Sequence, residues 1–500
     1  MAFLSLITES VLCQAKYLKI LYSPLNESSI ASVETEIGEI IILTEINSYL
    51  LTNDYILILK INMLGDTIAS RKVKRTEDVY TFNKILYLGN NKFVALGGAF
   101  DYGSNYYTSI NNKVIQFTFD SNLDSISTVE ISISVNPIPL LSQRDAIINH
   151  NNHIVSLLED MSGKNIMILE TTTEGDSIAF NKIVPESSSQ IYAIMEQPDF
   201  IGYYITSYGY FNDLTGQSNE NIISIDNDLN YLHQDSLPGR CSYMSQMEKS
   251  SNNILVGGRA QRLWTNYPPY ITEEYCIEKL DSTLQTTNQI FLSHVYQNHS
   301  QDPENDTISY PALSQNFDFI DTNNIYTCHY REYPSAIYPT RQNYFVVAKF
   351  DSNLELKWQY YFGNDAYYAP NHILATSDGG CFVTGNRYDY LTQNQEFDIF
   401  YLKLDSTGIF TSSGESNMAI HSALVFPNPG NDILYLESGP QVLGSYFQLY
   451  DLQGIKMHEL KITASQQHVN TLNMPLGMYI WRIVNRGKIV DSGKWIKAER

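Results

Sequence analysis

A few polar residues in this chain have types and spacings that could do chemistry. His150 and His153 share one short turn and could hold a metal ion, but no third ligand stands near them, so a solvated turn is the preferred interpretation. Asp226, Asp228 and Asn230 have the oxygen spacing that begins a calcium loop, but the glycine and the distant glutamate that complete such a loop are missing. The common catalytic motifs are also missing. We therefore predict no catalytic residue, no metal site and no cofactor.

Aromatic side chains gather in five long segments, which are the best candidates for ligand binding. These segments are residues 101–112, 208–221, 259–275, 329–344 and 387–397. Tyrosine and tryptophan offer a large, rigid contact area with a polar tip, and their planar rings can stack on sugars. The predicted ligand-binding residues are Tyr107, Trp264, Tyr267, Tyr270, Tyr333, Tyr338, Tyr388 and Tyr390. The alternative is that the rings pack the loops against the rest of the protein, because many of the 37 tyrosines must do so.

These segments recur because the chain is a repeat. The clearest copy, residues 354–408, contains four short apolar pieces, and we find seven copies, mostly 50–58 residues apart, with one interval of 70. Each copy ends in an alternating strand closed by a turn of Asp, Ser, Asn or Gly. Seven units of four short strands predict an all-β fold: a seven-bladed β-propeller over residues 16–413. Equivalent loops of a propeller emerge on the same face, so the five aromatic segments would crowd one surface.

One copy also resembles a known type of repeat. Its residues Trp358, Gln359, Phe362, Gly363, Asp378, Gly379 and Gly380 are similar to the loosely defined propeller repeats of secreted bacterial proteins. The other six copies keep only the hydrophobic skeleton. The resemblance implies a fold and no particular activity.

The last part of the chain has a different pattern. Residues 425–500 alternate apolar and polar residues between Gly and Asn turns, which predicts a small antiparallel β-sandwich behind a linker at 414–424. Pro427 and Pro429 cannot donate backbone hydrogen bonds, so we expect them to mark where the linker stops and the first strand begins. From Ala423 onward the chain has 8 Lys+Arg and 6 Asp+Glu, a net charge of +2, so the preceding residues must carry −24 to give the formal total of −22.

This C-terminal part resembles the sorting domain of type IX secretion cargo. Five motifs carry the resemblance in the right order, through Pro427, Asn428, Pro429, Asp432, Leu434, Leu436, Tyr450, Asp451, Gly454, Leu476, Gly477, Tyr479, Arg482, Lys494 and Lys497. Of these, Pro427, Asn428, Pro429, Asp451, Gly454, Gly477, Tyr479 and Lys494 are the predicted sorting signal. The resemblance implies two partners, an outer-membrane translocon and a sortase-like peptidase, and a final location outside the cell or on its surface, reached through the periplasm. The alternative is an accessory sandwich that only stabilises the propeller.

The N-terminus and the cysteines fit this route less clearly. Residues 1–15 are interpreted as a truncated or degenerate signal peptide with a cleavage point at Ala15, against the alternative of a plain first strand, because a basic start is missing and Glu9 interrupts the apolar stretch. The five cysteines contain no CxxC pair, so buried free thiols are expected. The acidic charge argues against nucleic acid as a partner, and no apolar run is long enough for a membrane helix.

Three functions fit this sequence. The first is a secreted or surface-displayed propeller, not an enzyme, that binds a glycan or a protein through its tyrosine-rich face. The second is a secreted hydrolase or lyase acting on polysaccharide, with acids such as Glu273, Glu274 or Asp302 brought together from several blades. The third is a purely structural surface protein. Two carboxylates converging in the ring would favour the second function over the first.

Overall fold

The computed structural model describes most of the chain. The described residues are 17–21, 26–47, 55–73, 78–101, 113–133, 141–160, 165–184, 189–209, 219–237, 241, 243–250, 253–264, 270–292, 309–311, 315–331, 339–340, 342–392, 396–408, 419–426 and 428–498. The interpretation of residues 1–15 as a signal peptide therefore lies outside the described residues. Within them the fold is all-β, as predicted, and the helical content is one 3-10 turn, η2 (Pro440–Val442).

The described strands before Ser422 form seven antiparallel sheets. Five of them are built only from strands that follow one another in the chain, and the other two add one strand from elsewhere, so local hairpins dominate the pairing. The first three sheets are β2 (Asn26–Glu34) to β5 (Thr67–Val73) with β3 (Ile40–Asn47) and β4 (Tyr55–Ile61); β6 (Asp78–Gly89), β7 (Lys92–Asp101), β8 (Lys113–Asp120) and β9 (Ser125–Ser132); and β10 (Leu141–Ile148), β11 (Ile154–Asp160), β12 (Ile166–Thr171) and β13 (Ser177–Ile183).

The next three sheets have the same plan, with an addition in the last. They are β14 (Ser189–Glu196), β15 (Gly202–Gly209), β16 (Asn219–Asp226) and β17 (Tyr231–Leu237); β18 (Tyr243–Ser250), β19 (Asn253–Trp264), β20 (Tyr270–Leu280) and β21 (Thr286–Leu292); and β22 (Ser309–Pro311), β23 (Phe317–Phe319), β24 (Ile325–Arg331), β25 (Tyr344–Phe350), β26 (Leu356–Gly363) and β30 (Ala419–His421). In this last sheet, two short strands, β22 and β23, both pair with β24.

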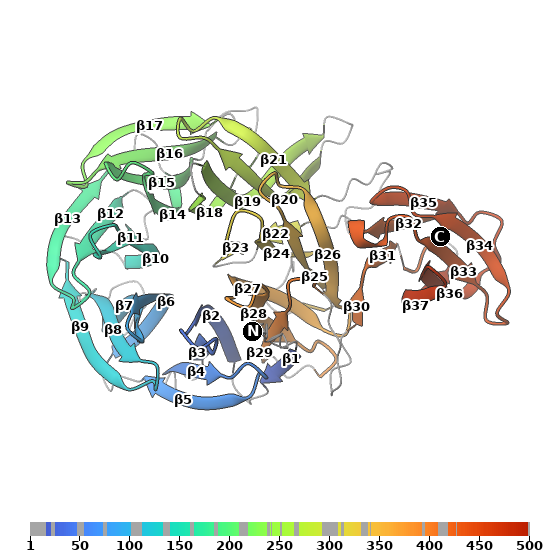
Figure 1. The fold of residues 1–500 in the computed structure, drawn as a ribbon, viewed down its shortest axis with the longest axis horizontal. Helices are drawn as coiled ribbons and strands as arrows, with labels where there is room; N and C mark the ends of the chain where they lie inside the picture. Colours follow the sequence, from blue (N-terminus) through green and yellow to red (C-terminus); the bar gives the residue numbers. More distant parts are fainter. Residues whose placement is uncertain are drawn as a thin grey trace, which may run out of the picture.

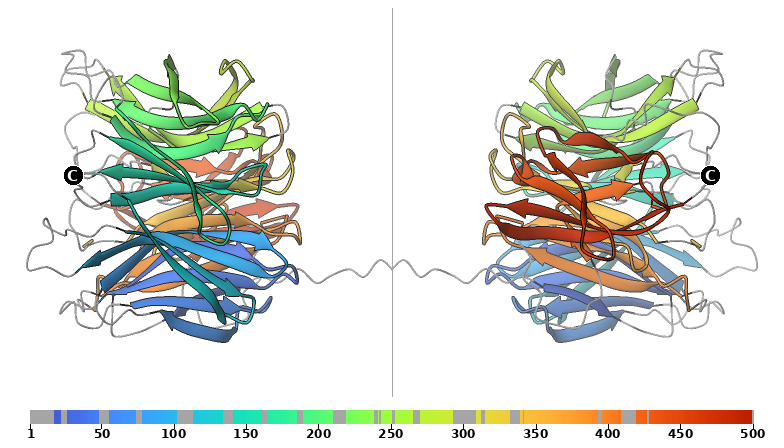
Figure 2. Two further views of the ribbon diagram at one scale, coloured as in Figure 1. Left: turned by 90° about the vertical axis from the view of Figure 1, so that its left-hand side faces the viewer. Right: turned by 90° about the vertical axis from the view of Figure 1, so that its right-hand side faces the viewer.

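The sheets stand around a common centre (Figure 1). In the first five sheets the first strand lies nearest the centre and the fourth lies at the rim, and neighbouring first strands contact one another around the ring, for example β2 with β6 and β10 with β14. Figure 2 shows the stacked sheets from the side, and Figure 1 shows the C-terminal unit at the edge of the ring. This order means that the repeat seen in the sequence begins with the rim strand of one sheet and continues into the next.

The N-terminal strand closes the ring. β1 (Tyr17–Leu21) pairs with β29 (Asp398–Leu404) in the seventh sheet, whose other strands are β27 (Tyr367–Ala375) and β28 (Cys381–Tyr388). Tyr17 packs edge-on against Tyr401, 6.0 Å between ring centroids. Its ring also fills the space where a Cβ on Gly65 would stand, and Gly65 has a φ of +80°. The two ends of the repeat region are thus held together by a strand that the sequence alone did not pair.

One turn design recurs between the third and fourth strands of the sheets. In the turn after β8, the Asp120 carboxylate accepts hydrogen bonds from the backbone N–H groups of Asn122 and Asp124, both at 2.9 Å, and Leu123 takes a φ of +68°. The same arrangement occurs after Asp281 and Asp351. A short acidic side chain can hold such a turn through its own backbone, so these aspartates are structural.

Hydrophobic side chains from neighbouring sheets form shared cores. One cluster joins Ile41, Leu43 and Ile58 of the first sheet to Phe93 and Phe117 of the second, all buried. A single sheet has two faces to cover, and stacking the sheets side by side around the ring covers both. The packing between sheets, rather than within one, therefore holds the ring together.

The C-terminal unit consists of two sheets around a core of its own. One sheet has β31 (Ala423–Phe426), β32 (Ile433–Ser438) and β35 (Gln466–Asn470); the other has β34 (Lys456–Lys461), β33 (Tyr446–Tyr450), β36 (Gly477–Asn485) and β37 (Lys488–Lys497). Leu434 and Val469 of the first sheet meet Phe447, Trp481 and Trp495 of the second in one buried cluster.

The structure corrects the predicted boundary between the two units. Strand β31 lies before Pro427, so the prolines do not precede the first strand. Residues 419–421, predicted as linker, form β30, which pairs with the rim strand β26 through Tyr361 and His421. The sequence "AIHSALVF" is apolar enough to continue in strands on both sides of Ser422. The rest of the predicted linker, 414–418, lies outside the described residues.

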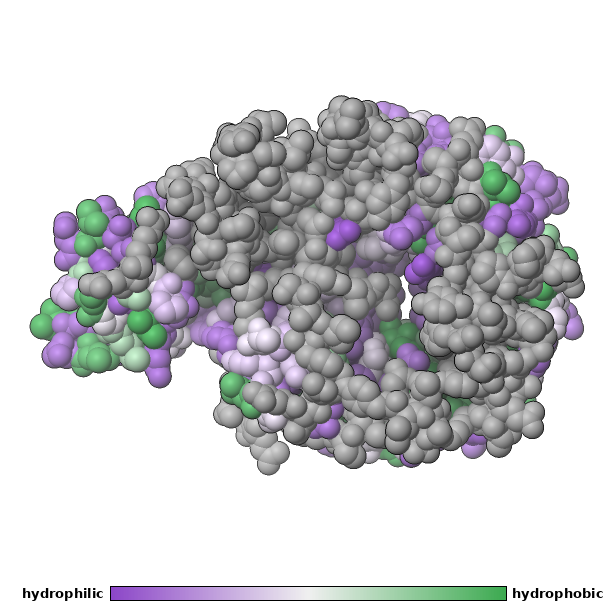
Figure 3. Space-filling view, turned by 180° about the vertical axis from the view of Figure 1, so that it is seen from behind, coloured by the Kyte–Doolittle hydropathy of each residue, from purple (hydrophilic) through white to green (hydrophobic). Residues whose placement is uncertain are grey.

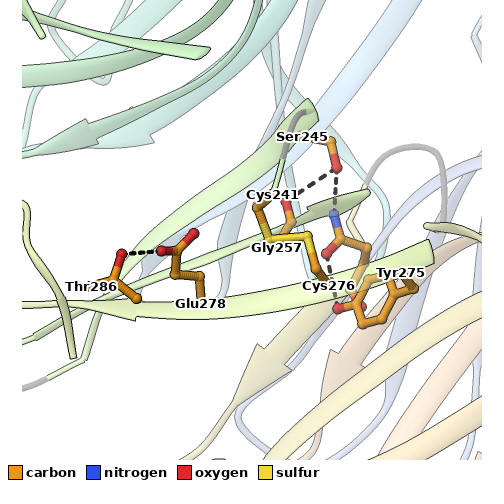
Figure 4. Close-up of a disulfide and its surroundings, with 8 residues drawn as sticks. Cys241, Ser245, Gly257, Tyr275, Cys276, Glu278 and Thr286 are labelled. Carbon is orange, nitrogen blue, oxygen red and sulfur yellow. Dashed lines mark hydrogen bonds between the residues drawn. A yellow bond between two sulfur atoms is a disulfide. The ribbon is translucent and has the colours of Figure 1, made fainter. Parts of the chain in front are cut away.

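The structure also corrects the interpretation of the cysteines. Cys241 and Cys276 form a disulfide, with their Cα atoms 5.8 Å apart, whereas Cys328 and Cys381 are buried free thiols as expected. Figure 4 shows the disulfide beside a buried polar chain in which Asn316 Nδ2 donates to Ser245 Oγ at 2.7 Å and the Tyr275 hydroxyl donates to Asn316 Oδ1 at 3.2 Å. Gly257 permits this packing, because a Cβ there would lie 2.2 Å from Asn316 Oδ1.

Candidate functional site

Charged side chains from four different sheets converge near the centre of the ring. Lys84 comes from β6, Asp145 from β10, Glu248 from β18 and Asp318 from β23; we call these four residues the axial cluster. Each lies on the strand of its sheet nearest the centre, and Figure 3 shows an opening in the middle of the ring. All four are largely buried but keep some exposed surface, so the cluster is still in reach of solvent.

Hydrogen bonds tie the cluster to neighbouring sheets. Lys84 Nζ donates to Asp145 Oδ1 at 2.8 Å, and Asp145 Oδ2 accepts from the backbone N–H of Ile194 in β14 at 3.1 Å. Asp318 Oδ2 accepts from the backbone N–H of Ala375 in β27 at 2.7 Å. Asp145 and Asp318 thus each link their own sheet to the next sheet in the ring, and they also place negative charge near the centre.

Glu248 is held by the nearby glutamine of its own strand. Gln246 Nε2 donates to Glu248 Oε1 at 2.5 Å and to the Phe317 carbonyl at 2.7 Å, while Gln246 Oε1 accepts from the backbone N–H of Asn316 at 2.8 Å. One buried amide therefore fixes both Glu248 and the strand that carries Asp318. The positions of the two acids are coupled by this amide.

The surroundings shift the pKa values of the cluster strongly. Burial raises the pKa of Glu248 to about 8, and the nearby Asp318 carboxylate adds to the rise. Burial also raises the pKa of Asp318 to about 7, against the opposing effect of the hydrogen bonds it accepts. Burial opposes the charge on Lys84, but the attraction of Asp145, Glu248 and Asp318 raises its pKa overall.

His372 stands beside the cluster as a neutral group. Its Nδ1 lies 3.0 Å from Ser32 Oγ, and burial, with a contribution from the charge of Lys84, lowers its pKa to about 3. A neutral imidazole, an ammonium group and carboxyl groups that take up protons near neutral pH are chemically suited to hold a polar ligand or to transfer protons. Among the described residues, no three side chains of His, Cys, Asp or Glu are grouped as metal ligands.

Sequence reasoning missed the axial cluster. The acids suggested for the enzyme alternative were others: Glu274 is buried in β20, the side chain of Glu273 is not described, and Asp302 lies outside the described residues. His150 and His153 do not face each other but bind separate carboxylates, Glu196 at 2.5 Å and Glu170 at 2.8 Å. The only sequence signal is that the first strands of these repeats contain charged residues, and nothing in their local pattern marks these four.

The structure describes only part of the predicted aromatic site. Tyr107, Tyr267, Tyr333 and Tyr338 lie outside the described residues. Trp264 and Tyr270 are paired opposite each other at the end of the long hairpin β19–β20, and only their backbone is described. Most of the predicted loop 259–275 is therefore strand, which projects beyond the residues paired with the rim strand β21.

The two remaining aromatic candidates have different environments. Tyr388 is 4% exposed and packs on Phe397, 5.1 Å between ring centroids, inside a core cluster. Its ring therefore lies within the core shared by the sixth and seventh sheets rather than on an exposed surface. Tyr390 is partly exposed, and its hydroxyl donates to Gln342 Oε1 at 2.5 Å.

The predicted sorting residues meet at one end of the C-terminal unit. Pro427 lies outside the described residues, but Asn428 lies alongside β37: its Nδ2 donates to the Lys494 carbonyl at 2.9 Å, and its Oδ1 accepts from the Ile496 N–H at 2.9 Å. The peptide bond between Asn428 and Pro429 is cis. The Pro-Asn-Pro segment is thus attached to the last strand of the unit, rather than marking an entry into its first.

The other sorting residues shape the turns at this end. Asp451 accepts from the backbone N–H groups of Gln453 at 3.0 Å and Ile455 at 2.8 Å, and Gly454 closes that turn with a φ of +83°. The Tyr479 hydroxyl donates to the Pro475 carbonyl at 2.6 Å, and Gly477, two residues earlier, has a φ of +145°. The Lys494 side chain is exposed on β37.

Buried polar contacts attach the C-terminal unit to the ring. The Tyr361 hydroxyl donates to Glu437 Oε1 at 2.7 Å, and Arg331 lies 3.6 Å from the other carboxylate oxygen. Burial raises the pKa of Glu437, and Arg331 opposes that rise. Asp491 accepts from the backbone N–H of Ser422 at 2.6 Å and from His421 Nδ1 at 2.9 Å.

Comparisons with known proteins identify the C-terminal unit. Residues 424–498 match the protein family described as the secretion system C-terminal sorting domain. The chain is therefore cargo of the type IX secretion system, exported to the cell surface or the extracellular space. Among the described residues, no helix is long and apolar enough to span a membrane. No curated protein matches the chain.

Several solved structures resemble the chain at low similarity. One is a polysaccharide lyase, with 10% identity and a TM-score of 0.40, covering 75% of this chain and 90% of that chain. Another is a GH43 β-1,3-galactosidase with galactodeoxynojirimycin, with 11% identity and a TM-score of 0.32, covering 51% and 91%. A third is a protein of unknown function from Dyadobacter fermentans, with 11% identity and a TM-score of 0.37, covering 64% and 94%. At these TM-scores the similarities support no functional argument.

Proposed function

We propose that this type IX cargo is a seven-bladed β-propeller, residues 16–413, that binds an extracellular glycan or protein, followed by a sorting β-sandwich at 425–500. Seven sheets in a ring, with first strands inside and fourth strands at the rim, support the propeller. The connections between second and third strands all leave one face of such a ring. We assign the predicted aromatic residues other than Tyr388 to the loops of that face, which is the proposed binding surface.

The observation that carries the binding proposal is the β19–β20 hairpin. Its backbone pairs Trp264 directly with Tyr270, beyond the residues that pair with the rim strand β21. Planar rings on a firm support lose little conformational entropy on binding. The axial cluster lies at the centre of the same ring and would supply the polar contacts.

An array of glycans and surface proteins tests this proposal. Trp264→Ala with Tyr270→Ala should weaken binding of the wild-type ligand by about 100-fold, because two aromatic contacts are lost. Tyr204→Ala, in β15 of the adjacent sheet, is a control for the loss of an aromatic side chain outside the β19–β20 hairpin. Unchanged binding by the double variant would remove the arm from the site, and an array without any ligand would contradict the binding function.

A second candidate function is a polysaccharide hydrolase or lyase, and the axial cluster is the observation that favours it. Acids from three sheets converge there, and the raised pKa of about 8 leaves Glu248 largely protonated at neutral pH. Such a carboxyl can donate a proton to a leaving group, while a second carboxylate or the neutral His372 accepts one. Lys84 would orient an acidic sugar.

This candidate has its own experiment. The purified protein is incubated with a panel of polysaccharides, and products are followed by reducing ends for hydrolysis and by ultraviolet absorbance of unsaturated sugars for elimination. Glu248→Gln should lower an observed rate at least about 100-fold while the array signal is kept, because the amide retains the shape but cannot donate the proton. Equal rates in both proteins would exclude Glu248 as the acid.

The export route is tested in a bacterium that has the type IX system. Deleting Ala423–Arg500 should leave the passenger in the periplasm. Its folding must be checked there by protease resistance, since the deletion also removes Glu437 from Arg331 and Tyr361. Export of the deletion at the normal level would overturn the role of the sorting domain.

A further inference from the structure

The C-terminal unit exposes an unusual amount of apolar surface. Eleven of its large hydrophobic side chains are exposed among the described residues, compared with thirteen in the several-fold longer ring. Figure 3 shows hydrophobic side chains spread over this unit. A soluble unit that leaves so much apolar surface uncovered is typical of a protein that binds a partner there.

Six of these side chains gather at one end of the unit; we call them the end patch. Its members are Leu452, Ile455, Leu472, Leu476, Met478 and Ile496. Leu452 and Ile455, 65% and 61% exposed, belong to the turn between β33 and β34. Met478 of β36 and Ile496 of β37 are direct cross-strand partners.

The pairing of the strands brings the six together. Tyr450, where β33 ends, pairs with Ile480, so the turn after β33 lies level with the first residues of β36. Lys497 pairs with Gly477 and its Nζ donates to the Leu472 carbonyl at 3.0 Å, which ties the 471–476 connection to the same end. The six side chains therefore surround the point where β33 and β37 end and β36 begins.

The same end carries the sorting residues. Asn428 lies against Lys494 and Ile496, Asp451 and Gly454 form the turn that presents Leu452 and Ile455, and Gly477 and Tyr479 flank Met478. The contacts with the ring use other parts of the unit, namely Glu437 and Asp491, and the ring strand β30 that precedes it. The features that match the sorting family thus shape and surround an apolar surface that the passenger leaves uncovered.

We propose that the end patch is the surface by which the export machinery binds this cargo, through a protein component that presents an apolar surface with acidic groups at its edge. The charge supports this partner: the unit from Ala423 onward is net positive, and Lys494 and Arg482 are exposed on the strands of the patch, whereas the ring is strongly acidic. Apolar burial supplies most of the binding, and the basic residues orient the acidic edge of the partner. The proposal rests on the proposed export function.

The test uses the full chain in a bacterium with the type IX system. Leu452→Ser, Ile455→Ser and Leu476→Ser are combined, because all three side chains are more than half exposed and outside the core. The exported fraction should fall at least about tenfold, which is the effect expected from losing one buried leucine contact. The matched control is Leu443→Ser with Ile489→Ser and Val490→Ser, three exposed residues of the same unit away from the patch, and its export should be unchanged.

Each result bears on one claim. Loss of export in the patch variant alone, with an unchanged melting temperature, supports the patch. Loss of export in both variants would show that export depends on the total exposed apolar surface of the unit, and the binding surface would then not be the end patch. If the patch variant is exported normally while the protein lacking Ala423–Arg500 stays in the periplasm, the end patch is not the binding surface, but the sorting function of the unit stands. A patch variant that only converts a dimer to a monomer in light scattering would overturn the proposed partner and assign the patch to a second copy.

Discussion

The disulfide between Cys241 and Cys276 gives the sharpest prediction about stability. The two residues are separated by 35 positions, and closing a loop of that length removes about 13 cal/mol/K of entropy from the unfolded chain. This amounts to about 4 kcal/mol at 25 °C. Reducing the bond, or replacing both cysteines by alanine, should therefore lower the free energy of unfolding of the ring by about 4 kcal/mol, plus a smaller cost for the cavity in the alanine variant.

Urea unfolding with and without a reductant measures this loss. The matched control is Cys328→Ala with Cys381→Ala, which removes two buried thiols without removing a cross-link; its unfolding should still respond to reductant, and that of Cys241→Ala with Cys276→Ala should not. Thiol titration of the denatured, unreduced 500-residue chain should find three reactive groups among its five cysteines. Five reactive groups, or a urea midpoint that does not change with reductant, would show that the disulfide is absent. The inference that the protein folds in an oxidising compartment, which rests on the disulfide, would then fail as well.

Three further changes probe the other parts of the molecule. The pKa of Glu248 in the folded protein is about 8, well above its ordinary value, so the fold favours the protonated carboxyl. The stability that depends on this proton is fully present below about pH 4.5 and is lost as the pH rises through 8. Between pH 5 and 9 the free energy of unfolding from urea titrations should therefore fall by about 2–4 kcal/mol less in Glu248→Gln than in the wild type, and an equal fall in both would contradict the raised pKa. Asp491→Ala removes the acceptor of the Ser422 N–H and should cost the C-terminal unit about 3 kcal/mol, seen in the tryptophan fluorescence of Trp481 and Trp495; an unchanged midpoint would show that water replaces the carboxylate. Tyr17→Ala should destabilise the ring closure by about 3–5 kcal/mol and speed hydrogen exchange in β29 ahead of β12, whereas equal protection of both strands would contradict the role of β1 as a latch.

The sequence predicted the parts of this fold that depend on local patterns. Alternating apolar residues and Asp-containing turns identified each strand–turn–strand unit, since Asp120, Asp281 and Asp351 form their turns with their own neighbours. The sorting motifs were found for the same reason, because Asp451 and Gly454 make one tight turn. Such features are complete within a few residues.

The rest of the site depends on contacts between distant segments. Lys84 and Asp318 are 234 positions apart in the sequence, and neither belongs to a local motif that would mark it. They come together because β6 and β23, the strands that carry them, both lie next to the centre of the ring. The disulfide escaped for the same reason, because Cys241 lies before β18 and Cys276 lies in β20, two strands apart in the same sheet.

The junction between the ring and the C-terminal unit explains why the predicted boundary was misplaced, and it determines which variants can separate export from stability. A proline-rich segment normally separates domains, but here it lies on β37, while the preceding residues extend the sheet of the ring through β30. Removing everything from Ala423 leaves Tyr361 without Glu437 and the Ser422 N–H without Asp491. The truncated ring would expose a surface that is covered in the full chain, so poor recovery of the truncated protein has two explanations. Point variants of exposed residues such as Leu452 and Ile455 leave that junction intact, and for this reason they separate recognition by the export machinery from stability of the passenger.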